Sequence, residues 1–154
     1  MGDTEAGLRA WSHFLGASAL VLRDIEARLK AAGQPSIGWY DVLLELERAG
    51  GKLRVHELAA RLVIERYNAT RLLDRMEAAG VIRREQASED RRGTLVSITS
   101  EGLRQREAVW PYYRQAIGGA FGTALTTAEA ASLTESMKKL MAHHRNRNRH
   151  SGLH

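Results

Sequence analysis

The stretch Leu53–Thr99 constrains the fold of this chain most strongly, because its apolar residues change their period part-way along it. Apolar residues at helical spacing predict a short helix over residues 55–62 and a longer helix over residues 66–79. Only residues 63–65 separate the two, and they lack the glycine that many such turns contain. Two helices joined by so short a turn indicate a helix-turn-helix, whose second helix enters the major groove of DNA.

A predicted β-hairpin follows the helix pair. Gly80 is placed to end the second helix in the left-handed conformation that glycine adopts readily. Residues 81–84 and 94–98 are rich in β-branched side chains and predict two short strands, and residues 52–54 are long enough to add a third. The predicted fold class is therefore mainly α (α+β), with a winged helix-turn-helix in residues 52–99.

The outward face of the second predicted helix carries the candidate DNA-binding side chains. Its apolar residues lie within about 100° of one another, and side chains that can hydrogen-bond base edges and phosphates occupy the opposite face. These side chains are Arg66, Tyr67, Asn68, Thr70, Arg71 and Arg75. An ordinary solvated face is the alternative interpretation, although Glu and Lys would be more typical of one.

The tip of the predicted hairpin has the sequence Asp90-Arg91-Arg92-Gly93. An arginine at such a tip can enter a narrow A·T-rich minor groove, where the electrostatic potential is most negative. Asp90, Arg91 and Arg92 are therefore further candidate DNA-binding residues. Taken alone, the tip is explained equally well as a solvated hairpin end.

This stretch resembles the MarR family of dimeric bacterial transcription regulators. The residues that carry the resemblance, in matching order and spacing, are Glu57-Leu58-Ala59, Thr70-Arg71-Leu72-Leu73-Asp74-Arg75-Met76-Glu77, Gly80-Val81-Ile82-Arg83-Arg84, Asp90-Arg91-Arg92 and Ile98-Thr99-Ser100-Glu101-Gly102. The similarity extends over residues 8–142. Glu65, where the family often has a serine, and the bulky pair Tyr67-Asn68 depart from the pattern, and both bear on which operator sequence is bound.

The resemblance implies a homodimer in which the helices of residues 8–31 and 103–142 interdigitate with those of a second copy. A symmetric dimer would bind a pseudo-palindromic operator with half-sites about one helical turn, roughly 34 Å, apart. The resemblance also implies that Arg92 reaches the minor groove while Asp90 holds the wing tip in shape. A monomer whose helices fold back on the module is the alternative.

The charge of the chain agrees with an anionic partner. Its formal net charge is +5, of which residues 1–51 carry −2, residues 52–106 carry +4 and the remainder carries +3. Such a basic balance favours nucleic acid, here double-stranded DNA. The lack of cysteine excludes disulfides and thiolate metal sites.

Other classes of protein find little support in the sequence. There is no signal-peptide pattern and no apolar run of 18 residues, so we expect a cytoplasmic protein with no membrane partner. The six histidines lack ligand-like spacing, and no phosphate-cradling glycine loop or nucleophile-elbow motif occurs. We therefore expect no metal site, no cofactor and no enzymatic activity.

Helices are predicted on both sides of the module. Residues 8–31 and 37–49 repeat apolar side chains at helical spacing, and a long helix from residue 103 contains Pro111, which should bend it. Thr126 or Thr127 with Glu129 can cap a last helix. We expect residues 1–142 to form a single domain. Residues 143–154 are basic with almost no apolar content, which predicts a disordered tail.

The resemblance further implies a small-molecule pocket between the dimerisation helices and the DNA-binding module. The candidate ligand-binding residues are Trp11, Trp39, Tyr40 and Asp41, because aromatic rings pack a planar ligand and a carboxylate can fix its polar edge. Some family members that bind aromatic or purine-like compounds have a tryptophan on the first helix and an aspartate on the second, which Trp11 and Asp41 match loosely. Plain core packing of the two tryptophans is the alternative.

Two functions are therefore predicted. The first is a sequence-specific DNA-binding transcription regulator whose binding responds to a small-molecule effector, aromatic or anionic in character. The second is a ligand-independent DNA-binding architectural or interaction protein that uses the same module. Footprinting distinguishes them, because the first protects one or a few palindromes and the second coats DNA uniformly.

Overall fold

The computed structural model of the chain describes residues 4–62, 69–86 and 93–151, with side chains up to residue 147. It forms two compact units, residues 1–116 and residues 117–154. The single domain predicted for residues 1–142 stays a prediction. Among the described residues, no helix is both long enough and apolar enough to span a membrane.

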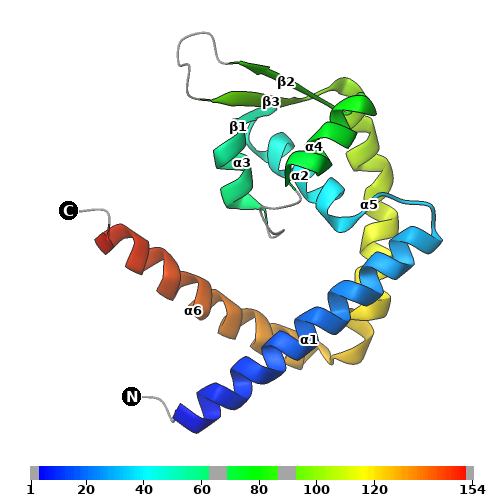
Figure 1. Cartoon of the computed structure of the whole chain (residues 1–154). Coiled ribbons are helices and arrows are strands. Elements are labelled where there is room, and N and C mark those ends of the chain that lie inside the picture. The colour runs from blue at the N-terminus through cyan, green and yellow to red at the C-terminus, as the bar shows by residue number, and fades with distance from the viewer. Residues whose placement is uncertain (1–3, 63–68, 87–92, 152–154) are drawn as a thin grey trace. The chain divides into compact units, whose positions relative to one another are not determined.

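The first unit contains a small sheet with helices packed on it (Figure 1). In chain order the elements are α1 (Thr4–Ala31), α2 (Ile37–Arg48), β1 (Lys52–Arg54), α3 (Val55–Arg61), α4 (Ala69–Ala78), β2 (Ile82–Gln86), β3 (Thr94–Ile98) and α5 (Ser100–Ala120), which runs into the second unit. The mainly helical winged fold predicted from the sequence is confirmed. Ser36 caps α2, because its hydroxyl accepts a hydrogen bond of 3.2 Å from the backbone N–H of Trp39.

The three strands form an antiparallel sheet in the order β1-β3-β2, which confirms the third strand predicted at residues 52–54. Leu53 of β1 lies opposite Val96 of β3, and Val96 lies opposite Arg84 of β2. Directly opposed residues point to the same face of a sheet. Leu53 and Val96 are buried on that face, so Arg84 extends from the same row as two core residues.

The core of this unit lies between the sheet and α2, α3 and α4. Every element contributes at least one side chain that is almost fully withdrawn from solvent. The buried residues are Val42, Leu43, Leu46, Leu53, Leu58, Leu72, Leu73, Met76, Val81, Ile82 and Val96. Burying a side chain such as Leu or Met contributes about 1.5–3 kcal/mol, so this core holds α4 firmly against the sheet.

The second unit contains the end of α5, a short 3-10 helix η2 (Gly122–Ala124) and α6 (Thr127–Ser151). The predicted cap of the last helix is confirmed for Thr126: its hydroxyl accepts from the backbone N–H of Glu129 at 3.2 Å, and the Glu129 carboxylate accepts from the backbone N–H of Thr126 at 2.9 Å. Pro111 lies inside α5, and the bend predicted there stays a prediction.

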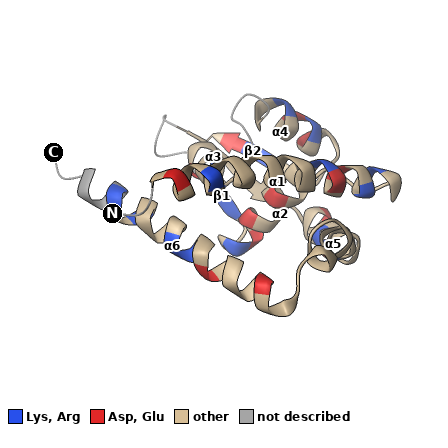
Figure 2. Ribbon diagram, turned by 90° about the horizontal axis from the view of Figure 1, so that it is seen from below, with Lys and Arg blue, Asp and Glu red and all other residues tan. Residues whose placement is uncertain are grey.

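The disordered tail predicted from His143 onwards is wrong for residues 143–151, because α6 continues to Ser151. Low apolar content argued for disorder, but no glycine or proline interrupts the chain between Thr127 and Ser151. Basic side chains near a helix C-terminus also interact favourably with the helix dipole. Figure 2 shows this distribution, with the acidic residues of α6 in its first half and basic residues towards its end.

Candidate nucleic-acid interface

Helix α4 has the two faces that the sequence predicts. Leu72, Leu73 and Met76 are buried, and the side chains predicted to contact DNA that lie within α4, namely Thr70, Arg71 and Arg75, are exposed. Figure 2 shows both basic and acidic residues on this helix. The exposed acidic residue between the two arginines is Asp74. The helix therefore presents hydrogen-bond donors of the kind that bind base edges and phosphates, together with one carboxylate.

Other predicted DNA contacts lie outside the described residues. These are Arg66, Tyr67 and Asn68, which precede α4, and Asp90, Arg91 and Arg92 in the connection between β2 and β3. The short turn predicted at residues 63–65 lies outside the described residues as well. The contacts assigned to these side chains stay predictions.

Helix α4 ends where the sequence predicts, at a glycine with positive φ. Gly80 has φ +78°, its backbone N–H donates to the carbonyl of Glu77 at 2.9 Å, and Val81 N–H donates to that of Met76 at 3.1 Å. A positive φ is strained for residues with a side chain, so glycine is needed at this position. The turn directs the chain straight into β2, which places the wing strands beside the end of the helix.

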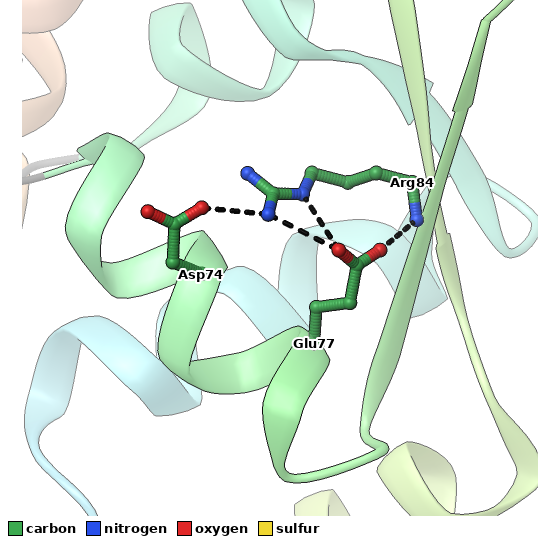
Figure 3. Close-up of polar contacts among 3 residues, drawn as sticks. All are labelled: Asp74, Glu77 and Arg84. Carbon is green, nitrogen blue, oxygen red and sulfur yellow. Dashed lines mark hydrogen bonds and ion pairs between the residues drawn. The ribbon is translucent and has the colours of Figure 1, made fainter.

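An arginine of the wing binds two carboxylates of α4 (Figure 3). The guanidinium of Arg84 donates from Nη2 to Asp74 at 2.6 Å and to Glu77 at 3.1 Å, and its backbone N–H donates to Glu77 at 2.7 Å. Hydrogen bonds from the Arg84 backbone, and then from its side chain, lower the pKa of Glu77. Sequence reasoning missed this cluster. Its recognisable pattern is an acidic pair three residues apart on a helix, followed by an arginine at a core-facing strand position.

The start of α5 is joined to the same region. Thr99 Oγ1 accepts a hydrogen bond of 3.0 Å from the N–H of Gly102, and the backbone N–H of Thr99 donates to the carbonyl of Val81 at 3.1 Å. A Cβ built on Gly102 would lie 2.2 Å from the carbonyl oxygen of Val81. The close approach of two backbones therefore requires glycine here.

A cleft of about 710 Å³ lies beside α4. It is lined by Glu26, Ser36, Gly38, Arg71, Leu72, Asp74 and Arg75. Both carboxylates are engaged, because Asp74 accepts from Arg84 and Glu26 accepts from the backbone N–H of Ile37 at 2.9 Å. The remaining charged groups of the lining are two guanidinium groups. Glu26 keeps its negative charge, because its partner is a neutral backbone group, so the lining carries charges of both signs with Arg71 and Arg75 as its cations.

The four predicted ligand-binding residues do not converge within one copy of the chain. Trp39 lines a cleft of about 540 Å³ that also contains Ser36 and Arg75, and its Nε1–H donates to Gln105 at 2.5 Å. Trp11 is 57% exposed on α1. Tyr40 is buried, with its ring centroid 4.8 Å from that of Tyr113. Of the four, Trp39 alone lines either of these two clefts.

Asp41 lies half-buried on α2 and has a perturbed acidity. Burial is the largest cause that raises the pKa of Asp41, to about 6, and the negative charge of Glu45 is the next. The positive charge of Arg48 lowers this pKa and offsets part of the rise. Asp41 also helps to raise the pKa of Tyr113, where burial is the larger cause. A carboxyl group with this pKa changes its charge near neutral pH, which is unusual for aspartate.

The first half of α1 presents large apolar side chains to solvent. Leu8, Trp11, Phe14 and Leu15 are between 43% and 62% exposed. Trp11 and Phe14 lie close together, with ring centroids 6.3 Å apart. Their spacing of three and four residues places them on one side of the helix. Exposed apolar surface of this kind marks sites where proteins, membranes or ligands bind.

Comparisons with known proteins agree with this geometry. Residues 33–93 match the model of the MarR family. An uncharacterized HTH-type transcriptional regulator, YkoM of Bacillus subtilis, is 28% identical over 101 residues, which are 66% of this chain and 65% of that protein. The chain covers less than two thirds of the length of this and the next curated relative, 65% and 52% respectively.

Two solved structures from Streptomyces coelicolor share the fold. AbsC, a MarR family transcriptional regulator, matches with a TM-score of 0.74 and 26% identity, over 95% of this chain and 97% of that chain. Sco3205, a MarR family transcriptional regulator in complex with DNA, matches with a TM-score of 0.74 and 26% identity, over 87% of this chain and 88% of that chain.

Proposed function

Because residues 33–93 match the MarR family model and the fold is that of the MarR family regulator AbsC, we propose that this chain is a transcription regulator of that family that binds specific sequences of double-stranded DNA as a homodimer. The exposed face of α4 carries the proposal. Thr70, Arg71 and Arg75 lie there on a helix that is held by its opposite face. A recognition helix in the major groove needs this combination of donors and firm attachment.

The wing is proposed to add minor-groove contacts. Strands β2 and β3 bring the chain out to and back from the segment that contains Asp90, Arg91 and Arg92. In this proposal Arg92 reaches the minor groove and Asp90 holds the tip in shape. Among the relatives, Sco3205 is a MarR family regulator solved in complex with DNA, which supports a DNA partner for this chain.

A homodimer is proposed because α1 leaves an apolar stripe uncovered. Leu8, Trp11 and Leu15 are about half exposed in one copy, and removing such area from water stabilises an assembly by about 25 cal/mol per Å². A second copy of the same helices offers a matching apolar surface. The two α4 helices of a symmetric dimer would then bind half-sites about one helical turn apart.

The effector is proposed to be an anionic compound with an aromatic ring. Arg75 lines both clefts, and the second cleft adds the ring of Trp39. A carboxylate or similar anion bound by Arg71 and Arg75 would occupy arginines that DNA also needs. Effector and DNA would therefore compete. Trp11 and Asp41 line neither cleft, and their proposed part in the response rests on the family resemblance. If they take part, Asp41→Ala should leave DNA affinity unchanged and weaken release by the effector.

Selection of bound genomic fragments tests the proposed function. Fragments enriched by the purified chain should share a pseudo-palindromic sequence and lie near the genes that the protein regulates. Size measurement by analytical ultracentrifugation should give a dimer. Enrichment of fragments without a shared sequence would contradict a specific regulator and favour the ligand-independent architectural protein.

A further inference from the structure

Arg84 occupies an unusual place for a cation. It lies in the middle of β2, in the same cross-strand row as the buried residues Leu53 and Val96, and its side chain is 24% exposed. Charged side chains at core-facing positions need partners to offset the loss of water. The neighbouring residue Arg83 belongs to the opposite face of the sheet and is exposed.

The partners of Arg84 both come from α4. Its Nε and Nη2 donate to Glu77 at 3.3 and 3.1 Å, and Nη2 also donates to Asp74 at 2.6 Å. The Glu77 carboxylate additionally accepts from the Arg84 backbone N–H. The hydrogen bond to Asp74, and after it the one to Glu77, raise the pKa of Arg84 above its ordinary value, so the guanidinium stays charged. One planar guanidinium thus joins two turns of the helix to the wing strand, as Figure 3 shows.

We propose that Arg84 is a positioning residue for DNA recognition, because it fixes the wing strand β2 against α4 through Asp74 and Glu77. This inference rests on the proposed function. Asp74 is 57% exposed and lies three residues from Arg71 and one from Arg75. The hydrogen bond from Arg84 to Asp74 therefore fixes the part of α4 that carries these two arginines.

A direct contact between Arg84 and a phosphate is the competing explanation, and the salt dependence of binding separates the two. A side chain that neutralises one phosphate contributes about 0.9 to the slope of log affinity against log salt. A positioning residue changes affinity at every salt concentration and leaves the slope unchanged. Lysine would replace a phosphate contact, but its single ammonium group cannot reproduce the planar fork that binds both carboxylates.

The test uses the DNA fragment that the wild-type chain selects with highest affinity from a random-sequence library. Arg84→Gln and Arg84→Lys should both weaken binding to this fragment by at least about tenfold, or 1.4 kcal/mol, with an unchanged salt slope. Arg83→Gln is the matched control on the other face of β2, and its affinity should fall far less. Rescue by lysine together with a reduced slope for Arg84→Gln would overturn the proposal.

Amide hydrogen exchange in the free protein tests, without DNA, whether the hydrogen bonds from Arg84 to Asp74 and Glu77 hold β2 against α4. Arg84→Gln should speed exchange in both α4 and β2, whereas Arg83→Gln should not. Unchanged exchange in both elements would overturn the proposal even if no DNA sequence is selected.

Asp74→Ala is a second variant, to be used if Arg84→Gln unfolds, because it retains the three hydrogen bonds between Arg84 and Glu77. It should weaken DNA binding although it removes a negative charge, and tighter binding would contradict the role assigned to Asp74.

If the wild-type chain selects no sequence, the proposed function fails. If it selects one that the Arg84 variants bind with wild-type affinity, this inference alone fails.

Discussion

The hydroxyl group of Thr99 donates a hydrogen bond of 2.6 Å to the backbone carbonyl of Gly80. This bond joins the residue that ends α4 to the residue that precedes α5. The same hydroxyl oxygen accepts from the N–H of Gly102. In the proposed dimer α5 belongs to the dimerisation helices, so Thr99 joins one of those helices to the end of the proposed recognition helix.

Replacing Thr99 by valine keeps the shape of the side chain and removes its hydroxyl group. The N–H of Gly102 then loses its cap, and loss of a helix cap costs about 0.5–2 kcal/mol. We expect Thr99→Val to lower the free energy of urea unfolding by about 1 kcal/mol. Thr99→Ser retains the hydroxyl group and should stay close to wild type. Equal losses in the two variants would show that the methyl group, rather than the hydrogen bonds, stabilises the joint.

Gly102→Ala should be more damaging, because the added methyl group would lie 2.2 Å from the carbonyl oxygen of Val81 and 2.7 Å from Ile98 Cγ1. Forcing a methyl group into packed surroundings costs about 1–3 kcal/mol. Gly118→Ala is the matched control in the same helix, since nothing lies within 4 Å of its Cβ position. Alanine there should be neutral or should stabilise the helix by about 0.5–1 kcal/mol. Unfolding curves of both variants check this, and equal stability of the two would contradict the close approach at Gly102.

The element order was predictable from the sequence because local patterns determine it. The apolar spacing of Leu72, Leu73 and Met76 and the stop at Gly80 predicted α4, and both are confirmed. The Arg84 cluster was not predictable in this way, because it depends on the register that sets Arg84 opposite Val96. The tail was mispredicted, since low apolar content does not prevent helix formation where glycine and proline are absent.

The candidate ligand-binding residues lie apart within one copy of the chain for a related reason, and their role stays a prediction. Trp39, Tyr40 and Asp41 are consecutive on α2, so their side chains leave the helix about 100° apart. Tyr40 packs against Tyr113, whereas Trp39 lines the cleft with Arg75. Sequence proximity grouped residues that the helix separates. The role of Arg71 and Arg75 in lining a cleft depends on how α4 packs beside α2, which spacing along the chain does not reveal.

The acidity of Asp41 predicts how stability changes with pH. Its pKa is raised from 3.8 to about 6, so the folded chain binds this proton more tightly than the unfolded chain. Protonated Asp41 therefore favours folding below about pH 4, and this contribution is lost as the pH rises through about 6. Asp41→Asn should remove that part of the pH dependence in urea unfolding between pH 4 and 7. Asp24→Asn, at an exposed carboxylate paired with Arg28, is the control and should preserve the wild-type pH dependence.

Arg71 is expected to contact a base. Arg71→Ala should cost about 1–3 kcal/mol at one base position and relax the preference there, because an arginine that binds a base edge discriminates between bases. Binding to the selected fragment and to its single-base variants measures this. Arg104→Ala removes an exposed arginine of α5, and its base preferences should match wild type. Equal losses on selected and random DNA for Arg71→Ala would mean that Arg71 only neutralises the DNA backbone.

Footprinting of the wild-type chain on a selected genomic fragment tests the central claim most directly. A homodimer with two exposed α4 helices should protect one pseudo-palindromic site, with half-site centres about one helical turn, roughly 34 Å, apart and on one face of the duplex. Protection should appear at protein concentrations that leave the flanking DNA fully accessible. Uniform protection along the fragment, with no half-sites at any concentration, would contradict a dimeric, sequence-specific regulator.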